Sequence, residues 1–178
     1  AKGVPVASAF PKEGAIGILP TVVIPAGAKN KALAERYPSR DGHHVGWVQT
    51  GQVWQTLSIR NIGGFDLVDC VGTADGGLVV LERRFRWSEA LTGVKSRLRR
   101  FGADEVRPGV LMEGEVMLEA DMGQEIDNLE GLAAHTGSAG ETVLTLISDD
   151  NFSSWFQRTI LLQFSLGPGD NSPKAAPR

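Results

Sequence analysis

Short apolar runs recur along the chain, and turn-forming residues separate them. Thr50-Gly51, Asp75-Gly76-Gly77 and Ser138-Ala139-Gly140 each stand between two such runs. Only segments 29–36 and 88–91 look helical, and both are short. The pattern therefore predicts an all-β protein, with strands expected at 16–24, 45–49, 53–59, 78–85, 94–101, 110–118, 142–147 and 159–166.

The spacing of the runs limits the architecture. From Leu67 onward a turn follows every 8 to 15 residues, which is typical of a sandwich, a barrel or propeller blades. A propeller blade needs about 40 to 50 residues, so a chain of 178 residues would supply about four blades. From Gly167 onward small and polar residues dominate, and we expect a disordered tail over 167–178.

Composition excludes some classes of protein. The net charge of −3 provides no global basic field for nucleic acid. Two arginine clusters, at 83–86 and 97–100, lie in alternating patterns, so we expect them on solvated strand faces. No run is long enough to span a membrane as a helix, and no signal peptide is visible. The chain begins at Ala1 rather than Met, which suggests a processed or truncated product and is compatible with export.

Cysteine and histidine offer little chemistry. The single Cys70 excludes an internal disulfide, and its apolar neighbours predict a buried, inert thiol. His43 and His44 are adjacent in a Gly-flanked segment, and His135 ends an apolar run. We expect solvent-exposed turn histidines rather than metal ligands. No serine-hydrolase elbow, phosphate loop or zinc motif is present.

Carboxylates and amides stand beside three strands that otherwise look buried. An isolated buried carboxylate is unfavourable unless it is paired or binds a metal. Oxygen-only clusters suit hard cations, calcium above all. The residues concerned are Glu82, then Asp127, Asn128 and Glu130, then Asp149, Asp150 and Asn151.

Each of these groups also has a structural explanation. Glu82 could pair with an arginine on a neighbouring strand. Asp127 and Asn128 could cap a turn, and the segment from Asp149 to Asn151 could form an Asx turn. Their joint occurrence at strand ends is what favours a common site.

Several segments resemble one bacterial family. "IDNLEGLAAH", "GETVLTLISDDNF" and "QRTILLQFSL" resemble the C-terminal part of the family called esterase-like activity of phytase, or phytase-like. "GGLVVLERRFRW", "GVKSRLRR" and "RPGVLMEGEVMLEAD" resemble the part just before it, and order and spacing agree from Gly64 to Leu166. The resemblance implies a β-propeller, a periplasmic or secreted location, and hydrolysis of phosphoesters or carboxylic esters.

The resemblance also suggests roles for residues. The acid of the family's Leu-Glu-Arg-Arg segment is Glu82, and Glu130 matches the acid of its Asn-hydrophobic-Glu-Gly segment. The Ser-Asp-Asp-Asn-Phe segment holds Asp149 to Asn151, and the Gln-Arg-Thr segment holds Gln157 and Arg158. We expect Ca²⁺ at some of Glu82, Asn128, Glu130, Asp149 and Asn151. Asp127 or Asp150 would act as general base, and Arg83 or Arg158 would bind the substrate.

The N-terminal segment departs from the family. By the resemblance, "KNKALAERYPSRDG" joins two separate family segments, with Glu35 matching the later acid. We therefore expect a β segment with deletions over 1–63, phytase-like blades over 64–166, and a propeller that is partial or incompletely read. Because an open propeller exposes sheet edges, a second chain could complete the ring.

Two functions follow from these residues. The first is a metal-assisted hydrolase of a small phosphoester or carboxylic ester. The alternative is a non-catalytic propeller that binds a ligand or protein, with its acids in structural ion pairs. If a site exists, Glu82, Glu130 and the turn at Asp149 should converge, and Asp149 and Asp150 should point in opposite directions.

Overall fold

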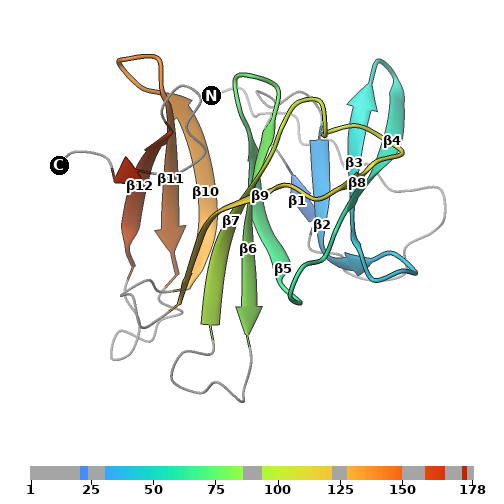
Figure 1. Cartoon of the computed structure of the whole chain (residues 1–178), viewed down its shortest axis with the longest axis horizontal. Helices are drawn as coiled ribbons and strands as arrows, with labels where there is room; N and C mark the ends of the chain where they lie inside the picture. The colour runs from blue at the N-terminus through green and yellow to red at the C-terminus, as the bar shows by residue number, and fades with distance from the viewer. Residues whose placement is uncertain are drawn as a thin grey trace, which may run out of the picture.

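The computed structural model describes residues 21–23, 31–85, 94–121, 128–149, 159–166 and 174–175. For 21–23, 31–32, 35–37 and 174–175 the description is limited to the backbone. Within these ranges the chain forms strands and turns and no helix (Figure 1). The all-β prediction is confirmed.

The strands form three sheets, which we name A, B and C. Sheet A has the order β1 (Thr21–Val23), β2 (Lys31–Pro38), β3 (His44–Thr50), β4 (Val53–Ile59), β8 (Leu111–Met112). Sheet B has the order β5 (Asp66–Gly72), β6 (Leu78–Phe85), β7 (Val94–Phe101), β9 (Glu115–Asp121). Sheet C has the order β10 (Leu129–Thr136), β11 (Thr142–Ser148), β12 (Leu161–Leu166), β13 (Lys174–Ala175). Neighbours are antiparallel except β4 and β8, which are parallel.

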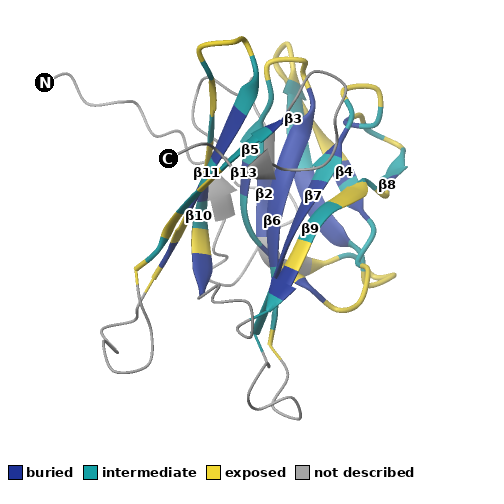
Figure 2. Ribbon diagram, turned by 60° about the vertical axis from the view of Figure 1, so that its left-hand side comes forward, coloured by how far each residue is buried: buried dark blue, intermediate teal, exposed yellow. Residues whose placement is uncertain are grey.

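Sheet B lies between the other two and is covered on both faces. Alternate residues of β6 point to opposite faces, as in any strand. Leu78 and Val80 join the apolar core shared with sheet A, whereas Val79 and Leu81 join the core shared with sheet C. This two-sided burial explains why β6 is almost continuously apolar, and Figure 2 shows it as the dark centre of the molecule.

The first strand of sheet B holds the three sheets together. β5 lies against β2 of sheet A and against β10 of sheet C. Each sheet thus places an early strand near β5 and extends outward through later strands (Figure 1). Successive four-stranded meanders arranged in this way are blade-like, which agrees with the expected architecture at this coarse level.

Most expected strands are present within a few residues of their predicted bounds. Segments 45–49, 53–59, 78–85, 94–101, 142–147 and 159–166 correspond to β3, β4, β6, β7, β11 and β12. Of segment 16–24, residues 21–23 are described and form β1. In the expected tail, Lys174–Ala175 pairs with β12.

The helical prediction for 29–36 is wrong. Lys31–Pro38 is strand β2, which pairs with β1 on one side and with β3 on the other. Leu33 is buried in the core between sheets A and B. Pairing on both sides outweighs the helical preference of Ala, Leu and Glu, because propensity is a weak prior. Segment 88–91 lies outside the described residues.

Besides β2 and β13, the strands β5 and β10 were not among the expected ones. β5 contains two aspartates, and β10 is rich in Gly and Ala, so neither shows a clear alternating apolar pattern. Both also carry an irregularity in register, between Leu67 and Asp69 in β5 and between Leu129 and Gly131 in β10. A bulge of this kind shifts the side-chain alternation and hides it in the sequence.

The single strand expected at 110–118 is divided by Gly114. β8 precedes this glycine and joins sheet A, whereas β9 follows it and joins sheet B. Gly114 has a φ of 63°, and a Cβ there would lie 2.6 Å from the Phe101 ring and 2.9 Å from the Arg100 carbonyl oxygen. Only glycine fits this backbone conformation and this space.

Two smaller expectations have clear outcomes. Cys70 is buried, as expected for an inert thiol. The expectation that His44 is an exposed turn residue is wrong, because His44 lies at the start of β3 and is buried. Its neighbour His43 is half-buried in the turn. In the described ranges no helix is long and apolar enough to cross a membrane.

The geometry at Gly114 gives a first prediction. Gly114→Ala should lower the free energy of unfolding by about 1–3 kcal/mol more than Gly109→Ala, because it adds a clash to the backbone strain. Gly109 is the matched control, since its φ is 77° and a Cβ there meets nothing within 4 Å. Urea unfolding of both variants measures the difference, and equal losses would contradict the clash.

Candidate functional site

Four of the candidate residues lie at one edge of sheets B and C. At this edge β6 and β11 end and β10 begins, in the lower part of Figure 1. Arg83 lies near the end of β6, Asn128 and Glu130 lie at the start of β10, and Asp149 directly follows β11. Strand ends that are distant in sequence therefore supply side chains to a common edge.

Arg83 binds two other residues at this edge. Its Nη1 donates to Glu130 Oε1 at 2.7 Å and to Asn128 Oδ1. Asn128 Nδ2 also donates to Glu130 Oε1, at 2.7 Å. The backbone N–H of Asp149 donates to the Asn128 carbonyl oxygen at 3.0 Å. We call Arg83, Asn128 and Glu130 the Arg83 cluster; it ties β6 of sheet B to β10 of sheet C.

The Arg83 cluster is partly open to solvent. The side chain of Arg83 is 25% exposed and that of Glu130 is 41% exposed, whereas Asn128 is buried. Within the described residues both side-chain hydrogen bonds of the guanidinium use Nη1, so Nε and Nη2 keep their donors for other partners. Such a partly exposed guanidinium can bind a phosphate or carboxylate through two parallel hydrogen bonds.

Glu82 has different partners. It is fully buried, with Oε2 2.7 Å from Arg97 Nε and Oε1 2.5 Å from Arg99 Nη2. Both arginines come from the neighbouring strand β7, and Arg97 stands directly opposite Glu82. The salt bridge that the sequence offered as the structural explanation for Glu82 is thus present.

The two arginines of β7 also bind backbone carbonyls. Arg97 Nη2 donates to Ile62 O at 3.0 Å, and Arg99 Nη1 donates to the carbonyl oxygens of Arg60 and Glu113, both at 2.9 Å. The Arg97 guanidinium also lies 4.0 Å from the centroid of the Phe65 ring. We call Glu82, Arg97 and Arg99 the buried triad.

The buried triad corrects a prediction. Arg97 and Arg99 were expected on a solvated face, but they are 3% and 0% exposed. They are tolerated inside because Glu82 and backbone oxygens accept from them. Burial nonetheless lowers the pKa of Arg99, while the charge of Glu82 raises it again.

The alternation of β6 separates Glu82 from Arg83. Consecutive residues of a strand point to opposite faces, so Glu82 turns toward sheet A and Arg83 toward sheet C. The structure therefore brings together Arg83, Asn128 and Glu130 with the backbone of Asp149. It gives Glu82 partners on the other face of β6. The remaining predicted site residues lie outside the described residues: Asp127, Asp150, Asn151 and Arg158, together with Gln157.

Asp69 is a carboxylate that the sequence analysis missed. Its Oδ2 accepts from the Leu132 backbone N–H at 2.7 Å, and its Oδ1 accepts from the Cys70 N–H at 2.8 Å. It thereby joins the edge of β5 to the edge of β10. Burial raises the pKa of Asp69, and these two hydrogen bonds oppose the rise. An aspartate inside the apolar run "LVDCV" was the available signal.

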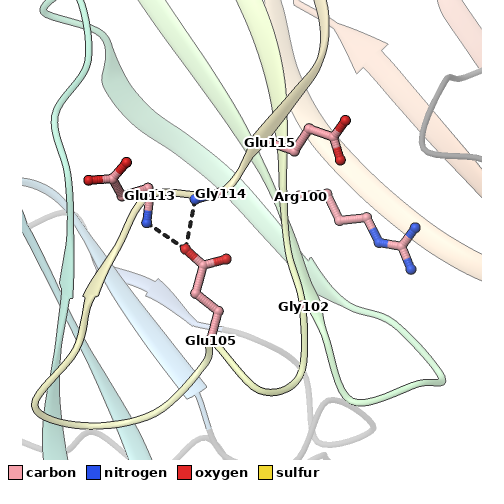
Figure 3. Close-up of a pocket in the computed structure, with 6 residues that line it drawn as sticks. All are labelled: Arg100, Gly102, Glu105, Glu113, Gly114 and Glu115. Carbon is pink, nitrogen blue, oxygen red and sulfur yellow. Dashed lines mark hydrogen bonds between the residues drawn. The ribbon is translucent and has the colours of Figure 1, made fainter.

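A second acidic surface lies in a shallow depression between β7 and the β8–β9 turn. It is lined by Arg100, Gly102, Glu105, Glu113, Gly114 and Glu115. Figure 3 shows the Glu105 carboxylate directed at the backbone amides of Glu113 and Gly114, at 2.5 and 2.8 Å. Glu113 pairs with Arg60, and Arg100 pairs with Asp75. These carboxylates therefore support local structure.

The described residues alone do not form a calcium site. Calcium takes about six to eight oxygen ligands. Asn128 Oδ1 and Glu130 Oε1 already accept hydrogen bonds from the positively charged guanidinium of Arg83. In the described ranges no three His, Cys, Asp or Glu side chains gather in a way that could hold a metal. Of the predicted calcium ligands, Asn151 lies outside the described residues, so calcium binding stays a prediction.

Comparison with known families agrees with the resemblance. The family model phytase-like, described as esterase-like activity of phytase, matches residues 27–152. The chain belongs to the phytase-like family. No curated protein and no solved structure matches it.

The phytase-like segment contains most of the candidate residues. It includes the Arg83 cluster, the buried triad and Asp149, whereas Arg158 lies after its end. The match also starts well before Gly64 and so includes β2, β3 and β4 of sheet A. Membership in the family does not establish an activity, which has to be argued from the residues of the site.

The buried triad gives the second prediction. Glu82→Gln should lower the free energy of unfolding by about 3–5 kcal/mol, because it leaves two buried guanidinium groups without a counter-charge. The control Glu113→Gln removes an ion pair whose side chains are 42% and 62% exposed, and it should cost about 0–1 kcal/mol. Chemical unfolding measures both. A Glu82→Gln variant as stable as the Glu113→Gln control would contradict this stabilising role of the triad.

Proposed function

We propose that this phytase-like protein hydrolyses a phosphoester or carboxylic ester at the Arg83 edge, where β6 and β11 end and β10 begins. The observation that supports this best is the convergence of Arg83, Asn128, Glu130 and Asp149 from three separate strands. A partly exposed arginine beside carboxylates is suited to an anionic ester. The family name points to the same class of substrate.

We propose further that the three sheets are blades of a β-propeller. Each is a meander whose early strand lies near β5, so the blade edges would line a channel. Propellers have about four to eight blades. A ring of that size needs more blades than sheets A, B and C provide, and further residues or a second chain would supply them. A periplasmic or secreted location is part of the same proposal.

Arg83 would bind and orient the ester. Its Nη1 is held by Glu130 and Asn128, which fixes the plane of the guanidinium. The donors on Nε and Nη2 would then bind two oxygens of a phosphate or one developing oxyanion. Asp127 or Asp150, which neighbour this edge in sequence, would take the proton from the attacking water. Arg158 would be a second ligand for the anion.

Calcium is the proposed cofactor of this edge. Its oxygen ligands would come from Asn128, Glu130, Asp149 and Asn151, while the carboxylate of Asp127 or Asp150 would stay unligated as the general base. When bound, a divalent cation polarises the scissile group and lowers the pKa of a bound water. Arg83 would have to share Glu130 and Asn128 with the ion.

A second candidate function is ligand binding without catalysis. The specific observation in its favour is that Glu82 and Glu130, two of the predicted metal ligands, are both paired with arginines. Carboxylates used in this way stabilise blades against one another. The open donors of Arg83 would then serve to hold an anionic ligand.

Hydrolysis is tested with aryl phosphates and aryl carboxylates. Arg83→Gln should reduce kcat/KM by about 100-fold or more, as expected for removal of a donor to the reacting oxygen. Arg100→Gln is the matched control, because Arg100 is a similarly exposed arginine paired with Asp75 elsewhere. Wild-type protein without turnover on either panel would reject the hydrolase and leave the binding function.

Calcium is tested by thermal unfolding. Calcium at about 100 times its Kd should stabilise the protein by about 2.7 kcal/mol, and EDTA should reverse the effect. Asp149→Asn and Asn151→Ala should each weaken the response, whereas Glu113→Gln should leave it unchanged. An identical melting temperature in calcium and in EDTA would reject the cofactor. A calcium response without turnover would favour the binding function.

A further inference from the structure

His44 lies between two sheets in an unusual position for a histidine. It belongs to β3 of sheet A, is 5% exposed, and faces the core shared with sheet B. Its imidazole hydrogen-bonds to the backbone of Phe65, which directly precedes β5. Among the described residues its Nε2 has no hydrogen-bond partner. One ring nitrogen is therefore used and the other is buried without a partner.

The surroundings of His44 are already positively charged. Sheet B directs the buried triad toward sheet A, and the triad has two guanidinium groups for one carboxylate. The charges of Arg99 and Arg97 both act on His44. A protonated His44 would be a third cation in a region where charge is poorly screened.

Few acids face His44 from the neighbouring elements. Asp66 at the start of β5 attracts a proton to the imidazole, but Asp66 is exposed and its field is screened by water. Glu82 of β6 is committed to Arg97 and Arg99. On the side of β4, Arg60 is paired with Glu113 at the surface. The balance of these groups opposes protonation.

We propose that His44 is an acid-sensitive clasp between sheets A and B. The neutral imidazole allows β3 to pack beside the buried triad. Its protonation brings a third positive charge against Arg97 and Arg99 and loosens sheet A from sheet B. The proposal does not depend on the proposed function.

The direction of the pH dependence follows from the folded state. Burial, then the charge of Arg99, lower the pKa of His44 from its ordinary value of 6.5. The folded protein thus binds a proton at His44 less readily than the unfolded chain. The contribution of His44 to stability is complete above pH 6.5 and is lost as the pH falls below that value.

The loosening should be local. Sheet C packs on the opposite face of sheet B through an apolar core, and the Arg83 cluster links the two sheets there. The described histidine of sheet C, His135, is exposed on β10 and lies outside that apolar core. Acid should therefore open the interface of sheets A and B before that of sheets B and C.

The test combines NMR with unfolding of the full chain. Histidine ring signals should show that the pKa of His44 lies below its ordinary value of 6.5. Between about pH 7.5 and pH 5 the melting temperature should fall by about 2–4 °C or more. His44→Gln should reduce that fall. His43→Gln, at the half-buried neighbouring residue, should retain it. After correction for the intrinsic exchange rate, amides of β3 and β4 should lose protection in acid before those of β11.

Three results would overturn the clasp. The first is a His44 pKa at or above the ordinary value of 6.5, which can be observed in the wild-type protein even if His44→Gln fails to fold. The second is an unchanged fall in melting temperature in a folded His44→Gln variant. The third is loss of amide protection in sheet C before sheet A.

Discussion

A carboxylate with no exposure to water can persist in a β-sheet core only if cations and hydrogen bonds surround it, and Glu82 meets this condition through Arg97 and Arg99. The same arginines extend past Glu82 to the carbonyls of Arg60 and Ile62, in the connection from sheet A to sheet B. The triad therefore does more than neutralise a charge. It holds the chain segment that joins one sheet to the next, and the position of sheet A depends on it.

The period of two along β6 places two polar groups on opposite sides of one strand. Glu82 serves the junction with sheet A, and Arg83, the next residue, serves the junction with sheet C. One face of β6 is thus closed and structural, and the other is partly open to solvent. Arg83 is partly exposed on the open face, whereas Glu82 is closed off from solvent on the other.

Alternation of apolar and polar residues was enough to predict the all-β class and most strand positions, because these strands have one or two buried faces. It failed for β2, β5 and β10, where helix-forming residues, aspartates or bulges mask the pattern. The pairing of Glu82 could be anticipated as an alternative, but the burial of Arg97 and Arg99 could not, since burial depends on which sheet covers β7. For the same reason Arg83, Asn128, Glu130 and Asp149 were identifiable as candidates, whereas the hydrogen bond from Leu132 to Asp69 required the relative placement of β5 and β10.

The parallel pairing of β8 with β4 has a consequence for how the protein is made. Leu111 and Met112 complete sheet A beside Ser58 and Ile59, although the chain builds most of sheet B in between. During synthesis on the ribosome, sheet A must wait with an open edge until residues 111–112 emerge, and closing such a long loop is slow. A chain stalled or cut after β7 would therefore present a bare strand edge at β4 to other nascent chains. The two residues of β8 thus cover the end of an edge strand, β4, which the chain completed about 50 residues earlier.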